Sequence, residues 1–311
     1  MKRFKVRWIA GMICVALFGA GAGSAGRAAD GPPPLPFHQI DGAGGGAITP
    51  MAYLVNPSTD GCMWGKPAMA LSYVNLGTKN LDAITVSETL WGRVELSYGA
   101  DRLYFGSLPS LVNHATGMDM GCASEWLHSF NVRYMVLQEN KHHFMGLPLP
   151  AVTAGVSFKY NEGIENVDRR LAGSLTAIGY RRPNGEDFTL TATKTIPEVL
   201  GRPLIVTGGL RLSEAAQTGF LGFSDTYRAS FEGNIVFPIT ERLLVAYEYR
   251  QKHDPYGQIP GIILGEDDWH ALDVALILNN QSSLTAGWGN FGRIADEVVN
   301  GAWWLQYKFE F

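Results

Sequence analysis

Beyond Lys66, the dominant period in the sequence is two, with apolar and polar residues alternating along most segments. In the last nine residues the apolar set is Trp303, Leu305, Tyr307, Phe309 and Phe311. The same pattern recurs within residues 93–98, 152–160, 227–235 and 243–250. Successive side chains of a β-strand point to opposite faces, so this period predicts strands with one apolar and one polar face. The sequence therefore predicts an all-β protein.

A soluble β-sandwich also alternates in this way, but the length and ends of these runs favour a membrane barrel. Several runs are about ten to thirteen residues long, as a tilted membrane strand requires, whereas a soluble strand has about five or six. The apolar face often ends in an aromatic residue, as expected for an aromatic girdle. Tyr307, Phe309 and Phe311 resemble the C-terminal signal that outer-membrane barrels present to the barrel assembly machinery. We expect an antiparallel transmembrane β-barrel, with that machinery and outer-membrane lipids as partners.

The first 29 residues are typical of a secretory signal peptide. Lys2, Arg3, Lys5 and Arg7 form a basic start, residues 8–22 are apolar, and small residues follow up to Ala29. We expect cleavage between Ala25 and Ala29 and export to the cell outer membrane. No later stretch is long enough for a transmembrane helix, which needs about 20 apolar residues. The domain boundaries expected are a signal peptide at 1–29, an N-terminal segment at 30–67 and a barrel at 68–311.

A bacterial outer-membrane barrel has an even number of strands, because both ends of the chain lie in the periplasm. Working back from Phe311, alternation predicts twelve strands, with short connections on the periplasmic side and long ones outside. Residues 164–178 instead repeat at spacings of three and four, which indicates a short amphipathic helix in an outer loop. The strands are expected near 68–76, 82–90, 92–105, 125–138, 149–160, 187–196, 203–213, 225–237, 241–252, 267–279, 282–290 and 302–311.

The segment at 30–67 does not alternate and is rich in proline and glycine. Two readings are open: a periplasmic tail, or a plug folded into the lumen, where glycines let the backbone approach the wall closely. The cysteines bear on this choice, because Cys62 and Cys122 remain after cleavage in an oxidising compartment and form a candidate disulfide. The predicted topology brings them together only if residues 47–67 climb into the lumen.

Twelve charged residues fall on the polar parity of the predicted strands and are candidates to line the lumen. Twelve strands lie between the eight that side chains just fill and the sixteen that leave a channel. We expect a narrow, partly filled lumen rather than an open pore, without strong preference for anions or cations. The candidates are Arg93, Glu95, Arg133, Lys159, Arg211, Arg228, Glu232, Glu248, Arg250, Asp273, Lys308 and Glu310.

The sequence offers no set of catalytic residues. His128 and Ser129 point to opposite faces by strand parity, and no Gly-x-Ser-x-Gly motif occurs. No histidine or cysteine spacing predicts a metal site, and no cofactor is expected. Glu266, Asp267 and Asp268 sit at an outer strand end, where an ordinary acidic loop is favoured over a Ca²⁺ site. A net charge of −4 also disfavours nucleic acid as a partner.

Several segments resemble a Gram-negative family that is catalogued only as a domain of unknown function. The two clearest are Gly42-Ala-Gly-Gly-Gly-Ala-Ile-Thr-Pro50 and Gly92-Arg-Val-Glu-Leu-Ser-Tyr98. Met51 departs from the pattern, in which an aromatic residue is expected after Pro50. The resemblance implies an exported outer-membrane protein and assigns no activity. Later stretches that look similar are 187–188, 192–194, 219–223, 248–252 and 266–269.

These observations lead to one favoured function and two alternatives. The mixed charge of the predicted lumen favours passive transport, or channel activity, for small or amphipathic solutes whose identity the sequence does not give. The first alternative is a non-conducting surface barrel that acts in structure or partner binding. The second is a lipid-modifying outer-membrane hydrolase.

Overall fold

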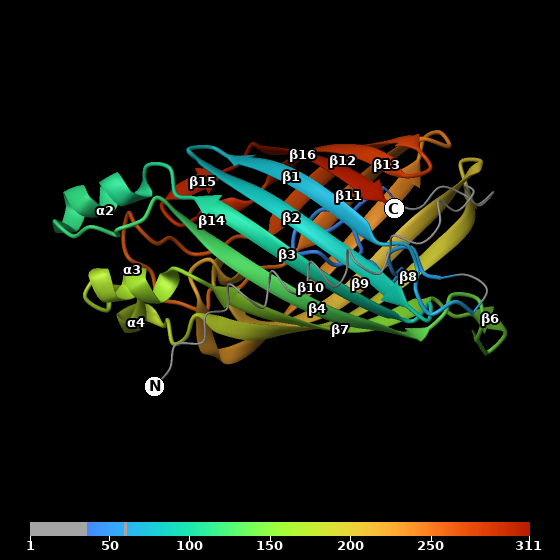
Figure 1. Cartoon of the computed structure of the whole chain (residues 1–311), viewed down its shortest axis with the longest axis horizontal. Helices are drawn as coiled ribbons and strands as arrows, with labels where there is room; N and C mark the ends of the chain where they lie inside the picture. The colour runs from blue at the N-terminus through green and yellow to red at the C-terminus, as the bar shows by residue number, and fades with distance from the viewer. Residues whose placement is uncertain (1–35, 59–60) are drawn as a thin grey trace. The chain divides into compact units, whose positions relative to one another are not determined.

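The computed structural model describes residues 36–58 and 61–311, so the predicted signal peptide lies outside the described residues. Twelve antiparallel strands form a closed barrel in which each strand pairs with its neighbours and β16 closes on β1 (Figure 1). The strands are β1 (Ala68–Leu76), β2 (Lys79–Leu90), β3 (Val94–Tyr104), β4 (Ser124–Leu137), β7 (Ala151–Asn161), β8 (Asn184–Val199), β9 (Arg202–Ala215), β10 (Phe223–Pro238), β11 (Leu243–Arg250), β12 (Trp269–Asn279), β13 (Ser282–Asn290) and β16 (Ala302–Glu310).

The wall turns its apolar side chains outward, which confirms the predicted strand faces. In β16, Trp303 and Leu305 are 44% and 47% exposed, whereas Trp304, Gln306 and Lys308 are buried. Leucine, isoleucine, phenylalanine and tyrosine side chains are exposed in the same way on other strands around the barrel. In a closed barrel, every strand pairs its backbone N–H and C=O groups with both neighbouring strands. The apolar outer surface therefore leaves no backbone polar group that requires water.

The two ends of the barrel differ in the length of their connections. At one end, β8 and β9 are joined by residues 200–201, β12 and β13 by 280–281, and β2 and β3 by 91–93. The connection at 138–150 is longer and carries a small hairpin of β5 (His143–Phe144) and β6 (Leu147–Pro148). We call this the short-turn end, where the C-terminus also lies (Figure 1). It corresponds to the predicted periplasmic side.

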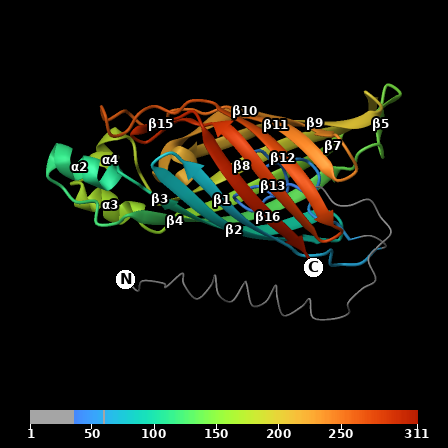
Figure 2. The same cartoon turned by 90° about the horizontal axis from the view of Figure 1, so that it is seen from above.

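The opposite end, the long-loop end, carries the helices. It holds α2 (Leu108–Thr116), α3 (Ile164–Arg170), α4 (Ser174–Ile178), η1 (Gln217–Gly219) and the hairpin of β14 (Gly292–Ile294) and β15 (Glu297–Val299) (Figure 2). The helical period in residues 164–178 is thus confirmed, although the helix breaks in two at residues 171–173. Helix α2 was not predicted: it lies in the long connection between the strands predicted at 92–105 and 125–138, and buries Leu108 and Val112. Among the described residues, each helix is too short or too polar to cross a membrane.

Candidate functional site

Residues 36–55, which we call the plug, are folded inside the barrel (Figure 2). The segment turns back on itself, since Gln39 N–H donates to Ala43 O at 3.0 Å and Gly46 N–H donates to Thr49 O at 2.8 Å. Phe37 and Met51 belong to a small apolar cluster with side chains of β10, β11 and β12. Residues 61–67 lie at the short-turn end, where the Phe311 N–H donates to Pro67 O at 3.0 Å.

Glu248 of β11 binds the centre of the plug through its carboxylate. The backbone N–H groups of Ala47 and Thr49 donate to its two oxygens at 2.7 and 2.8 Å, and Ile48 N–H donates to both at 3.3 Å. The Thr49 hydroxyl also donates to Oε2. Glu248 is fully buried, so these bonds replace its lost hydration. Hydrogen bonds to an ionised carboxylate are among the stronger ones in proteins.

Glu95 of β3 and Arg133 of β4 hold the two edges of the plug together. Glu95 accepts from Gly44 N–H at 2.9 Å and from Val55 N–H at 2.8 Å. Arg133 pairs with Glu95 at 2.9 Å, and donates to Gly44 O at 2.8 Å and to Met51 O. Side chains of the wall therefore bind the plug mainly through the backbone of the plug.

The glycines of the plug are required by this close approach. A Cβ at Gly46 would lie 2.2 Å from Glu248 Oε2, and one at Gly44 would lie 2.9 Å from Glu95 Oε2. Gly42 has a φ of +101°, and a Cβ there would lie 2.9 Å from the Tyr98 carbonyl carbon. Residues 42–50, 92–98 and 248–252, three of the segments that carry the family resemblance, therefore meet at this contact.

The start of the plug is fixed by His38. Its ring nitrogens lie 2.9 Å from Ser87 Oγ and 2.8 Å from Thr85 Oγ1, and Gln306 Nε2 donates to its carbonyl at 2.7 Å. Burial, reinforced by Lys308 and Arg133, lowers the pKa of His38 to about 3, so the ring is neutral at pH 7. Both ring nitrogens of His38 therefore face hydroxyl groups, and His38 and Ser87 are fully buried while the plug is docked.

Six charged residues, Asp41 of the plug and five of the wall, form a chain of alternating sign. Lys159 lies 3.9 Å from Asp41 and 3.0 Å from Asp187. Arg211 bridges Asp187 and Glu232, each at 3.0 Å, and Arg250 lies 3.3 Å from Glu232. Three carboxylates thus balance three cations. The sequence prediction missed Asp41 and Asp187, although Asp187 shares strand parity with other inward residues of β8.

Ten of the twelve charged candidates have buried side chains. Arg93 and Arg228 differ: Arg93 is only half-buried at the β2–β3 turn and donates to Met135 O at 3.4 Å, and Arg228 is exposed at the long-loop end. The partners of Glu232 are therefore Arg211 and Arg250 rather than Arg228. The buried ones are Glu95, Arg133, Lys159, Arg211, Glu232, Glu248, Arg250, Asp273, Lys308 and Glu310.

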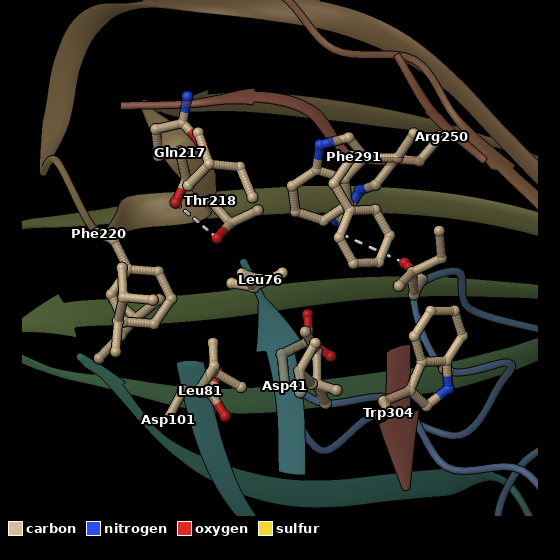
Figure 3. A pocket seen from close by; sticks show the side chains of 18 of the residues that line it. Asp41, Leu76, Leu81, Asp101, Gln217, Thr218, Phe220, Arg250, Phe291 and Trp304 are labelled. Atoms are coloured by element: carbon tan, nitrogen blue, oxygen red, sulfur yellow. Dashed lines mark hydrogen bonds between the residues drawn. The ribbon is translucent and has the colours of Figure 1, made fainter. Parts of the chain in front are cut away.

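A cavity of about 70 Å³, which we call the outer cavity, lies between the plug and the long-loop end (Figure 3). Ile40 and Ile48 of the plug line it, and most of its other lining residues are apolar. The charged residues that line it are Asp41, Asp101, Lys159 and Arg250. Asp101 was another inward residue that the sequence prediction missed, although it has the same parity on β3 as Glu95.

The predicted disulfide between Cys62 and Cys122 is not formed: both thiols are free. Cys62 lies at the short-turn end beside Trp64, which bridges to Leu90, whereas Cys122 precedes β4 at the long-loop end. The plug does enter the barrel, but the chain leaves it again before Cys62, and the prediction overlooked that return. Burial and the nearby Glu125 raise the pKa of the Cys122 thiol to about 11.

The structure places no catalytic pair at His128 and Ser129. Ser129 is buried on the inner face, whereas His128 lies on the outer face with its Nδ1 2.7 Å from the Tyr98 hydroxyl. Among residues 36–58 and 61–311, no three histidine, cysteine, aspartate or glutamate side chains are grouped to hold a metal ion. Asp267 of the acidic loop pairs instead with Arg293 at 2.6 Å, and Glu266 pairs with Lys252 at 2.9 Å.

Comparisons with known proteins place the chain in a family. It is similar to the KdgM porin in complex with disordered oligogalacturonate (9% identity, TM-score 0.47, 78% of this chain and 99% of that one). It is also similar to the NanC porin (8%, 0.46, 79% and 98%) and to outer membrane phospholipase A from Escherichia coli (6%, 0.37, 80% and 97%). No curated protein matches the sequence. A family model described as "Protein of unknown function (DUF3034)" matches residues 36–308, from the start of the plug into the last strand, and the chain therefore belongs to that family.

Proposed function

We propose that this protein is an outer-membrane channel for passive transport of small or amphipathic solutes, and that the plug is its gate, which blocks the lumen while docked and opens it each time it transiently leaves the wall. In this proposal the signal peptide at 1–29 is cleaved on export, the aromatic residues of β16 are read by the barrel assembly machinery, and outer-membrane lipids surround the wall. The short-turn end faces the periplasm. The observation that carries the proposal is the plug itself, held inside a closed barrel by Glu95, Arg133 and Glu248.

The outside of the wall supports a membrane position. Large apolar side chains such as Leu272, Val274 and Leu276 on β12 are exposed in a row, alternating with buried Ala271, Asp273 and Ala275. Exposed apolar surface on this scale is unfavourable in water and favourable in lipid.

The nature of the plug contacts supports a movable gate. Its central contacts are hydrogen bonds to charged side chains, and water can replace these when the segment moves. The wall behind it keeps its own ladder of backbone bonds, so release of the plug leaves the barrel intact. What remains would be an interior lined by both signs of charge, which water and small solutes can occupy.

A cross-link between plug and wall tests the proposal. Ala52 N–H donates to Thr193 Oγ1 on β8 at 2.7 Å, so cysteines at these two positions are neighbours. The variant Ala52→Cys/Thr193→Cys, with Cys62 and Cys122 changed to serine, should be silent in a planar bilayer when oxidised and should conduct after reduction. Thr193→Cys alone, treated with the same oxidant, is the control and should conduct throughout.

Two outcomes contradict the proposal. Conductance that is unchanged by a mass-verified cross-link would mean that the plug is not the gate. Silence in both the oxidised and the reduced state, and in the control, would support the non-conducting surface barrel. The filled interior is the observation that favours this alternative.

A further inference from the structure

The outer cavity has an aromatic side and an acidic side. Trp269, Phe291 and Trp304 all line the cavity. Phe291 is tilted against Trp269, with ring centroids 4.9 Å apart, and stacks on Trp304 at 5.8 Å. Figure 3 shows Phe291 and Trp304 at this cavity together with Asp41 and Asp101. Aromatic faces carry a negative quadrupole and attract cations.

Asp101 is a buried carboxylate with one unpartnered oxygen. Its side chain is 3% exposed, and its neighbours across the sheet are Ala83 on β2 and Leu127 on β4. Among the described residues, Asp101 Oδ1 has no hydrogen-bond partner, and the same is true of Asp41 Oδ1. An ionised carboxylate in such a place is costly unless a positive or hydrogen-bonding group meets it.

The cations that line the cavity are already engaged elsewhere. Lys159 contacts Asp187 at 3.0 Å, and Arg250 contacts Glu232 at 3.3 Å. The chain of six alternating charges is neutral without Asp101. Asp101 Oδ1 is therefore a buried acceptor that no donor of the described residues reaches, in a cavity that is otherwise mostly apolar and aromatic.

We propose that the outer cavity binds a small organic cation, with its ammonium group between Asp101 and Asp41 and its apolar body against the aromatic side. This inference names the class of solute for the proposed channel, and the role of the cation as a transported solute rests on that proposed function. Binding itself does not require that the barrel conduct. A protonated amine supplies the positive charge and the N–H donors that the two unpartnered oxygens lack.

A neighbouring polar cavity of about 40 Å³ is lined by cationic residues, so binding of an anion there has to be considered as well. Lys159, Arg211 and Arg250 line it, but each of them has a carboxylate partner. Arg228 also lines it and is exposed to solvent. The unpartnered oxygens belong instead to Asp41 and Asp101, which line the apolar cavity, and they favour a cation that donates hydrogen bonds.

Isothermal titration of the full-length protein in detergent with 2-phenylethylamine tests the inference. The amine is protonated at neutral pH, as a lysine side chain is. It should bind at least tenfold more tightly than the neutral 2-phenylethanol and the anionic 3-phenylpropionate, the difference expected for one charge-assisted hydrogen bond. Equal binding of the alcohol, or tighter binding of the acid, would overturn the inference, as would displacement of the amine by sodium alone.

The variant Asp101→Asn removes the charge at constant shape and should weaken amine binding at least tenfold. Asp82→Asn is the matched control: Asp82 pairs in register with Arg102 and lies on the outer face of β2, so its loss should leave binding unchanged. Retained binding in Asp101→Asn would refute the site. The comparison of three ligands on the unaltered chain decides the question even if that variant does not fold.

Conductance measured on the same preparations separates the two proposals. A protein that binds the amine and never conducts would overturn the channel and keep the cation site. A protein that conducts and does not bind the amine would overturn the cation site and keep the channel.

Discussion

Gly46→Ala should release the plug without unfolding the barrel. The added Cβ would lie 2.2 Å from Glu248 Oε2, so the carboxylate and the backbone of the plug cannot keep their contact. The backbone at position 46 itself accepts alanine, because its φ is not in the left-handed region. The perturbation therefore acts on the plug contact alone.

The size of the effect follows from the bonds that are lost. Ala47 and Thr49 each donate a backbone hydrogen bond to Glu248 at 2.7 and 2.8 Å. A hydrogen bond to a charged group contributes about 1.5 kcal/mol or more, so the loss of two costs about 3 kcal/mol. This corresponds to roughly a hundredfold rise in the ratio of released to docked plug.

Thiol labelling of Ala52→Cys, in a chain with Cys62 and Cys122 changed to serine, reports that ratio. Ala52 is 0% exposed, so its cysteine reacts with a maleimide only when the plug leaves the wall. Gly46→Ala should raise the labelling rate about a hundredfold. Gly208→Ala is the control, because a Cβ there meets nothing within 4 Å. A rate unchanged within about twofold, in protein that keeps its heat-modifiable gel mobility, would refute the reasoning.

Three further predictions concern the wall, its assembly and its loops. Gly287→Ala places a Cβ 2.0 Å from the Trp304 ring and should destabilise the barrel by about 1–3 kcal/mol in urea titrations; unchanged stability would mean that Trp304 moves freely. Removal of Phe311 should lower the amount of folded barrel in cells but not refolding into detergent, and equal cellular amounts would argue against an assembly signal. Arg293 lowers the pKa of Asp267, so this loop contact stabilises above about pH 4 and is lost as the pH falls further. Pepsin should cut an Asp267→Asn variant faster than the unaltered chain at about pH 4 and equally fast at about pH 2, and equal rates at both pH values would contradict this.

The position of residues 36–55 could not be predicted from the sequence. Its glycines allowed both a free tail and a plug, because glycine permits close approach without specifying what is approached. The partners that decide between the two, Glu95 and Glu248, lie 51 and about 200 residues away along the chain. Only closure of the barrel brings them to one place.

The cysteine prediction was wrong for a related reason. The prediction required residues 47–67 to rise through the lumen so that Cys62 could reach Cys122. In the structure the chain leaves the lumen before Cys62. A segment that enters and leaves the same end of a barrel shows no periodic pattern in its sequence. The wall binds the backbone of this segment rather than a regularly repeating set of its side chains.

The sequence by itself determined the wall: the period of two fixed which side chains face out, and the lengths of the runs and connections set twelve strands and two unlike ends. These are local properties, since each strand carries its own alternation. The tertiary structure alone decided how the interior is filled and which charges are paired. Parity puts Asp101 inside, but only the closed barrel shows that the nearby cations contact other carboxylates and that Asp101 Oδ1 has no donor among the described residues.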